Sequence, residues 1–315
     1  MLIVTSETRF KAILCVLAAV GVSSTQDAIT KSMSGSFSVY EAVIFRCIGS
    51  LPVLIPLLQR VGGTSALATP LLNWVLLRSL ILCGGYFSFV LAIAAMPIAN
   101  GVAIYFTMPF FVAGLAGPFL NERVRLYRWL AIVAAFAGVL VMVRPGAQAF
   151  EPAALLSLAS AAFYAVGQMM GRKLSQSVAP AVMATWQNVI YFAIALLLCL
   201  LFNTFGPFHF SHKSLLFLSR PWVWPSLADA AIMLVNGVFA GMGMVLFVTA
   251  YKLAESSFVA PFEYSSMIWA VTFGILVFGD FPDRYTLAGA AVVVIAGLLM
   301  VWRDRVLDRA VARAV

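Results

Sequence analysis

Charged residues are scarce in this chain: they make up 10% of its 315 residues, whereas hydrophobic residues make up 63%. A water-soluble protein of this size needs much more polar surface, so a soluble globular enzyme is excluded. The same composition excludes a disordered chain. A helix that crosses a membrane needs about 20 apolar residues. The composition therefore indicates an integral membrane protein.

Cysteine and histidine are also few, so the chain has few candidate ligands for a metal site and few thiols for a redox site. The four cysteines lie in apolar runs without any Cys-x-x-Cys pair, and we expect reduced, buried thiols at Cys15, Cys47, Cys83 and Cys199. His209 and His212 share one loop and have no third ligand beside them in the sequence. No G-x-x-x-x-G-K-[ST], H-E-x-x-H or G-x-S-x-G motif occurs. We therefore expect no metal, no cofactor, no enzymatic activity and no ATP coupling.

Apolar runs are what the sequence has in abundance, and their spacing predicts an all-α membrane protein with ten transmembrane helices. The runs are separated by charged residues, proline, glycine or asparagine. Their expected ranges are 10–31, 38–59, 71–95, 99–120, 125–143, 152–172, 180–204, 228–251, 256–279 and 284–303.

Basic residues lie at the ends of these runs and are not clustered on a polar face, so they indicate topology and not a nucleic-acid partner. With both termini inside, 13 Lys and Arg residues fall on the cytoplasmic side and five on the other. The positive-inside rule therefore predicts that both termini are cytoplasmic, in a multi-pass protein of the inner membrane. The one long connection, residues 203–227, is rich in aromatic residues and is expected to anchor at the membrane interface.

The two halves of the chain resemble each other. Residues 94–144 and 250–303 share anchor positions: Asn121-Glu122 corresponds to Gly279-Asp280, and Ala137-Gly138 corresponds to Ala296-Gly297. Five helices per repeat is an odd number, so the second repeat must be inserted upside down. We expect a first repeat at 1–150, a second at 151–303 and a short basic cytoplasmic tail at 304–315. Inverted repeats are a recurring architecture of secondary transporters.

These stretches resemble the EamA-type transporters of the drug/metabolite transporter superfamily. The resemblance is carried by residues 99–138 with Pro109 and Glu122, by the APFEY of residues 260–264, and by Gly279-Asp280 followed by the GAAVVVIAG of residues 289–297. The chain departs from the family pattern at Asp280, usually Glu, and at Asn121, usually Gly. The resemblance implies ten helices in two five-helix repeats. It also implies transport of amino acids, vitamins such as riboflavin, nucleotide-like metabolites or organic anions.

Ionisable residues inside predicted spans are costly and need a partner, a water-filled cavity or a function. Glu263 follows Pro261, which removes a backbone donor, and is the first candidate for proton coupling because burial favours a neutral carboxyl. An internal ion pair with Lys252 is the alternative for Glu263. Asp27 and Glu41 are further proton-coupling or ion-pair candidates. Arg46 needs a carboxylate, a backbone carbonyl or an anionic substrate group.

Aromatic and amide side chains within the spans are candidates for a substrate cavity, in which rings stack on a planar solute and amides orient it. Hydrogen bonding between helices without any ligand is the competing interpretation. The candidates are Tyr105, Tyr164, Gln168, Trp186, Gln187, Asn188, Tyr191, Asn236 and Tyr264.

The sequence therefore predicts a secondary active transporter that moves a small organic metabolite by alternating access. Uptake of a heteroaromatic vitamin such as riboflavin is the first choice, because neutral polar and aromatic side chains outnumber charges along the expected cavity. Export of amino acids or related metabolites and transport of organic anions are the alternatives within the same class. A non-transporting membrane scaffold and a membrane-embedded enzyme are the alternatives outside it. The expected partners are a small-molecule substrate and the lipid bilayer.

Overall fold

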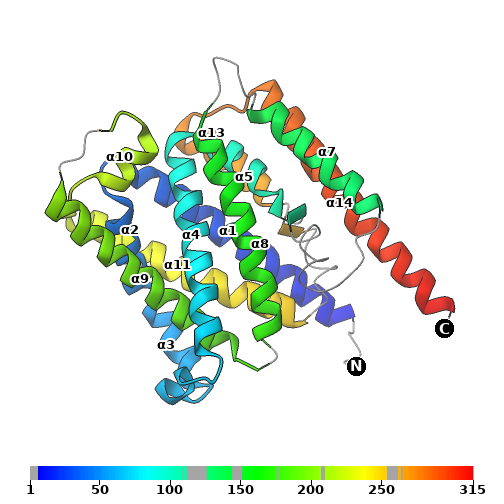
Figure 1. The fold of residues 1–315 in the computed structure, drawn as a ribbon, viewed down its shortest axis with the longest axis horizontal. Helices are drawn as coiled ribbons and strands as arrows, with labels where there is room; N and C mark the ends of the chain where they lie inside the picture. The colour runs from blue at the N-terminus through cyan, green and yellow to red at the C-terminus, as the bar shows by residue number, and fades with distance from the viewer. Residues whose placement is uncertain are drawn as a thin grey trace.

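The computed structural model describes residues 6–108, 110–111, 126–143, 151–175, 177–206, 210–253, 262–263 and 265–314, and the regular elements in these ranges are helices (Figure 1). Five of the described helices hold an apolar stretch long enough to cross a membrane, and six if one bent pair counts as a span. The five are α1 (Ser6–Met33), α4 (Leu72–Ala95), α8 (Ala153–Leu174), α9 (Pro180–Phe205) and α11 (Leu227–Leu253).

The remaining helices are shorter or carry shorter apolar stretches. They are α2 (Val39–Gly49), α3 (Leu51–Gln59), α5 (Ile98–Tyr105), α7 (Leu126–Val143), α10 (Lys213–Ser219), α13 (Ser266–Phe278) and α14 (Arg284–Ala314), with a 3-10 turn η1 at Gly63–Leu67. Helix α14 continues through the segment expected to be a tail. The start of α1 and the end of α14 both lie at the lower right of Figure 1.

The span expected at 38–59 is not one straight helix. It is the pair α2–α3, bent by 43° at Ser50. Pro52 lies in the first turn of α3 and has no N–H to donate to the Ile48 carbonyl, so the helix cannot continue straight through this point. Ser50 Oγ instead donates to the Cys47 carbonyl at 2.8 Å. The break leaves polar backbone and a hydroxyl in the middle of a membrane span.

Two other expected spans also differ from single helices. Helix α5 ends at Tyr105, four residues before Pro109, which cannot donate to the Tyr105 carbonyl. Helix α13 begins only at Ser266, and the described part of its expected span starts at residue 262. Pro109, Pro261, Asn121 and Glu122, which carry part of the repeat, lie outside the described residues.

Small residues bring helices into backbone contact. A Cβ on Gly237 of α11 would lie 2.2 Å from the Arg46 carbonyl of α2, and one on Gly289 of α14 would lie 2.4 Å from the Gly138 carbonyl of α7. Helices α7 and α14 run side by side at the right of Figure 1. The contact between α2 and α11 fixes the position of the helix turn that carries Arg46.

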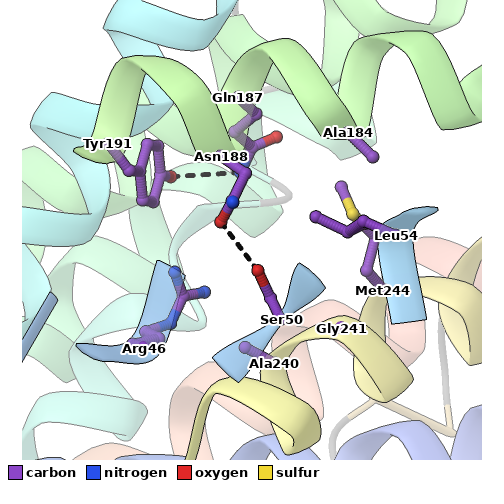
Figure 2. A pocket seen from close by; sticks show the side chains of 10 residues that line it. All are labelled: Arg46, Ser50, Leu54, Ala184, Gln187, Asn188, Tyr191, Ala240, Gly241 and Met244. Atoms are coloured by element: carbon purple, nitrogen blue, oxygen red, sulfur yellow. Dashed lines mark hydrogen bonds between the residues drawn. The ribbon is translucent and has the colours of Figure 1, made fainter. Parts of the chain in front are cut away.

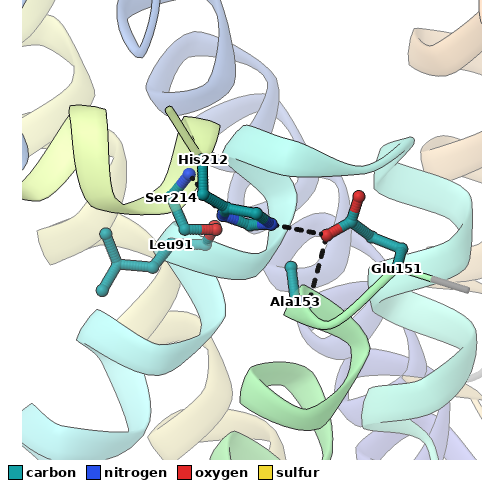
Figure 3. A network of polar contacts seen from close by, with 5 residues as sticks. All are labelled: Leu91, Glu151, Ala153, His212 and Ser214. Carbon is teal, nitrogen blue, oxygen red and sulfur yellow. Dashed lines mark hydrogen bonds and ion pairs between the residues drawn. The ribbon is translucent and has the colours of Figure 1, made fainter. Parts of the chain in front are cut away.

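The long connection between α9 and α11 is tied to the rest of the molecule by polar contacts. Figure 3 shows His212 Nε2 beside Glu151 Oε1, at 2.9 Å, where the same carboxylate accepts a bond from the Ala153 N–H at the start of α8. Ser214 Oγ donates to the Leu91 carbonyl of α4 at 2.7 Å. Trp224 in this connection is 84% exposed, as expected for an interface anchor. His209 lies outside the described residues.

Candidate functional site

A polar cavity lies where the bent pair α2–α3 meets α9 and α11 (Figure 2). Its volume is about 30 Å³, room for water-sized groups. Figure 2 shows the polar side chains of Arg46, Ser50, Asn188 and Tyr191 toward one side and those of Leu54, Ala184 and Met244 toward the other. The remaining lining residues are Gln187, Ala240 and Gly241.

Arg46 is the charged residue of this lining. It lies in the last turn of α2, where the negative end of the helix dipole favours a cation. Its guanidinium carbon lies 4.6 Å from the ring centre of Tyr86 on α4 and 5.7 Å from that of Tyr191 on α9. Both tyrosines are buried. Two aromatic faces therefore take the place of water around this cation.

Among the described residues, no carboxylate oxygen lies within 4.0 Å of an Arg46 nitrogen, the distance that defines an ion pair. The Arg46 Nε is buried and has no hydrogen-bond partner. Asp27 on α1 interacts with Arg46 electrostatically without forming such a pair. Removing an ion from water costs several kcal/mol even after the protein relaxes, whereas contact with aromatic faces returns only about 2 kcal/mol. The protein alone leaves this cation incompletely compensated.

The other polar groups of the lining, in contrast, are engaged by one another. Gln187 Nε2 donates to Tyr191 Oη at 3.1 Å, and Tyr191 Oη donates to the Leu82 carbonyl at 2.8 Å. Arg78 of α4 donates to the Gly167 carbonyl at 3.2 Å and reaches Gln187 Oε1 at 3.5 Å. This network links α4, α8 and α9 and orients the Tyr191 ring beside Arg46.

Asn188 connects α9 to the break between α2 and α3. Its Nδ2 donates to the Cys47 carbonyl at 3.2 Å, and its Oδ1 accepts from Ser50 Oγ at 3.0 Å. A side chain of α9 therefore satisfies the backbone that the bend exposes, as is required for irregular backbone at membrane depth.

A second cavity adjoins the first and is lined almost entirely by apolar residues. It has a volume of about 70 Å³ and shares Leu54, Ala184 and Met244 with the polar cavity. It continues to Leu57 near the end of α3, Pro180 at the start of α9 and Thr249 near the end of α11. The charge distribution predicts that these three helix ends are cytoplasmic. The two adjoining cavities therefore extend from these helix ends toward Arg46.

The predicted residues Gln187, Asn188, Tyr191 and Arg46 are brought together at the cavity. Tyr164 and Tyr105 lie outside its lining, in a row of rings in which Tyr105 contacts Phe89 at 5.5 Å and Tyr164 at 5.4 Å between ring centres.

Other predicted cavity residues lie elsewhere. Gln168 is exposed and does not share the environment of Tyr164. Trp186 Nε1 donates to the Leu67 carbonyl of η1 at 3.2 Å. Asn236 is buried and donates to Thr30 Oγ1 at 3.2 Å, joining α11 to α1. Tyr264 lies outside the described residues.

The predicted proton-coupling carboxyls occupy different places. Asp27 is half-buried inside α1, and Glu263 is half-buried and not part of the cavity lining. Glu41 is fully buried in the first turn of α2, where Oε2 accepts from the Val223 N–H at 3.4 Å and Oε1 has no partner. Glu41 therefore helps to hold the connection between α9 and α11 against α2.

Sequence reasoning missed Ser50, Tyr86 and Arg78. Pro52 was a signal for the bend at Ser50, because proline in a span frees backbone groups. Tyr86 stands among apolar neighbours in GGYFSF, but one sequence does not say which helix faces it.

Comparisons with known proteins extend these observations. A family model described as "EamA-like transporter family" matches residues 10–144 and again residues 151–302. The chain is 23% identical over 284 residues to an S-adenosylmethionine uptake transporter of Rickettsia bellii, covering 90% of each chain. It is 31% identical over 250 residues to a riboflavin transporter of Vibrio cholerae, covering 78% of this chain and 77% of the relative.

Two further comparisons concern an exporter and a solved structure. A pseudopaline exporter of Pseudomonas aeruginosa is 30% identical over 279 residues, covering 87% of this chain and 89% of the relative. One crystal structure aligns with a TM-score of 0.62 at 19% identity, over 93% of this chain and 98% of that chain. The alignment with this crystal structure shows a shared fold. The names of the relatives are those of transporters and not of enzymes.

Proposed function

This chain belongs to the EamA-like transporter family, and from that premise we propose that it is a secondary active transporter that takes up a small organic metabolite by alternating access. The observation that carries the proposal is the cavity beside Arg46, built on a broken helix and open toward one end of the bundle. Broken helices that expose polar groups near the middle of the membrane are typical of transporter binding sites.

We propose two inverted repeats of five helices as the basis of alternating access. The two separate matches to one family model support this. So does the opposite net charge of two corresponding turns, the basic NERVRLYR at 121–128 and the acidic GDFPDR at 279–284. The multi-pass chain would then lie in the inner membrane with both termini in the cytoplasm.

For the substrate we propose a metabolite with a planar heteroaromatic part. Riboflavin contains such a ring system, and so does S-adenosylmethionine, and relatives named for each align with most of this chain. The half-buried rings of Tyr105 and Tyr164 offer aromatic surface for such a group.

Energy for uptake would come from a solute or proton gradient, and Glu263 is the first candidate for the proton, with Asp27 and Glu41 next. Asp27 has the additional support of its electrostatic interaction with Arg46. Replacing each in turn (E263Q, D27N, E41Q) removes a titrating group with little change of shape. The carboxyl that couples protons is the one whose replacement abolishes uptake driven by a pH gradient while exchange of substrate persists.

Counterflow in proteoliposomes tests the proposal. Vesicles loaded with unlabelled S-adenosylmethionine or riboflavin should accumulate the labelled compound above its external concentration, whereas protein-free vesicles should not. A chain that is a scaffold, a receptor or an enzyme gives no counterflow with any candidate.

A further inference from the structure

Arg46 lines a cavity without forming an ion pair to a carboxylate of the described residues, while the hydrogen-bonding groups around it are used by the protein. We propose that Arg46 binds the carboxylate of the transported substrate, so that the chain selects carboxylate-bearing metabolites over neutral ones. This inference rests on the proposed transport function and narrows its substrate class.

The size of the cavity determines which part of a substrate fits beside Arg46. About 30 Å³ is far less than the 150 Å³ or so that accommodates a benzene ring, so in this conformation the polar cavity takes a group the size of a carboxylate and no aromatic ring. The adjoining apolar cavity begins at Leu54 and Met244, and its volume of about 70 Å³ is also too small for a ring, so in this conformation it takes the aliphatic segment next to the carboxylate and the ring lies farther toward the opening. The acid group then enters deepest and the apolar part lies toward the opening.

Charge balance favours a carboxylate over a phosphate at this position. The lining offers one cation, Arg46, and the neighbouring Arg78 already donates to Gly167 and Gln187. The guanidinium fork fits either group, but a phosphate monoester brings about two negative charges, whereas a carboxylate brings one and balances the single charge of Arg46. The Ser50 hydroxyl lies on the same side of the cavity, but its hydrogen is engaged by the Cys47 carbonyl and Asn188 Oδ1, so Arg46 supplies the donors for the acid group.

The decisive measurement uses wild-type protein and pairs of probes that differ in the acid group. S-adenosylmethionine is compared with decarboxylated S-adenosylmethionine, and L-tryptophan with L-tryptophan amide, as competitors in counterflow and as ligands of the purified protein in detergent. Losing one partner of a buried charge pair weakens binding by about thirtyfold or more, so at least one acid should compete that much better than its matched neutral or decarboxylated form. Riboflavin and its 5′-phosphate, in the same assay, separate neutral, phosphate and carboxylate recognition.

The variants R46Q and R46K locate the effect. R46Q should weaken binding of the preferred acid about thirtyfold and change binding of its matched partner by no more than about threefold. R46K should retain part of the preference for the acid, because lysine keeps the positive charge but lacks the fork of donors. R60Q, which removes an exposed arginine at the end of α3, is the matched control and should leave the preference unchanged.

Several results would overturn the inference and still leave the transport function standing. One is equal competition by an acid and its matched neutral or decarboxylated form. Another is preferential transport of riboflavin or its phosphate. A third is a preference for the acid that R46Q does not reduce. Wild-type vesicles that transport none of the probes contradict the inference and the proposed function together.

Discussion

At the scale of single residues, Tyr191 has two roles at the cavity. Its ring faces the Arg46 guanidinium, and its hydroxyl joins Gln187 to the Leu82 carbonyl. The ring and the hydroxyl can be separated experimentally, because phenylalanine keeps the first and removes the second.

Replacing Tyr191 by Phe should therefore reduce stability without removing the aromatic wall beside Arg46. Hydrogen bonds of this kind contribute about 0.6 kcal/mol in membrane proteins and about 1 kcal/mol in soluble ones, so the expected loss in unfolding free energy is of that order. Denaturant titration in detergent measures it. Tyr285→Phe is the control and should cost less, because the position is 41% exposed and its hydroxyl accepts a long, solvent-exposed bond from Arg284 at 3.4 Å. An equal loss in both variants would contradict the role given to the Tyr191 hydroxyl.

At the scale of helices, the site depends on how closely α2 and α11 approach. The Gly237 position leaves no room for a Cβ, which would lie 2.2 Å from the Arg46 carbonyl and 2.7 Å from Gly49 Cα. Any side chain there must push apart the two helices that carry Arg46 and Gly241.

Gly237→Ala should accordingly destabilise the protein by about 1–3 kcal/mol, the usual cost of overpacking, and reduce transport. Gly35→Ala provides the control, since no atom lies within 4 Å of the position of its added Cβ. Melting curves in detergent and counterflow rates give the two readouts. If Gly237→Ala were as stable and active as Gly35→Ala, the described contact between α2 and α11 would be wrong.

Much of the helix pattern follows from the sequence, because apolar length alone decides where a span can lie. The expected ranges 71–95, 152–172 and 180–204 lie within about two residues of α4, α8 and α9 at each end. The bend at Ser50 and the early end of α5 were not predicted, although prolines mark both. A prediction from hydropathy misses them because proline interrupts hydrogen bonds without lowering hydrophobicity.

The site was predictable only in part. Arg46, Gln187, Asn188 and Tyr191 were recognisable as polar or charged residues in apolar surroundings. Their grouping with Ser50 and Tyr86 was not, since it depends on which faces of α2, α4 and α9 meet. Gln168 shows the same limit: it follows Tyr164 by four residues, so helical spacing puts both on one face of α8, yet the packing leaves Gln168 exposed.

At the scale of the whole molecule, the end of the bundle opposite the apolar opening is held by polar contacts between distant segments. Lys31 Nζ at the end of α1 lies 2.8 Å from Asp280 Oδ2, just after α13, and donates to the Met96 carbonyl at 3.0 Å. Arg220 donates to the carbonyls of Ser34 and Phe37. These contacts join distant segments at one end while the cavities lie toward the other, which is the asymmetry that the proposed alternating access predicts for a single conformation.

The proposed arrangement of ten spans predicts that both ends of the chain lie on the cytoplasmic face. A reporter that is active only in the cytoplasm should be active when fused before residue 1 and after residue 315. The same reporter inserted in the connection between α9 and α11, within 221–226, should be inactive. Reporters of opposite activity at the two termini would contradict an even number of spans.

The most direct test of the account is whether the cavity beside Arg46 is the transport path. Ala184 and Ala240 line it, so A184C or A240C is introduced after Cys15, Cys47, Cys83 and Cys199 have been replaced, and the new thiol is treated with a bulky alkylating reagent. The account predicts that alkylation stops counterflow and that excess substrate slows the alkylation. Unchanged counterflow by fully alkylated protein would contradict it.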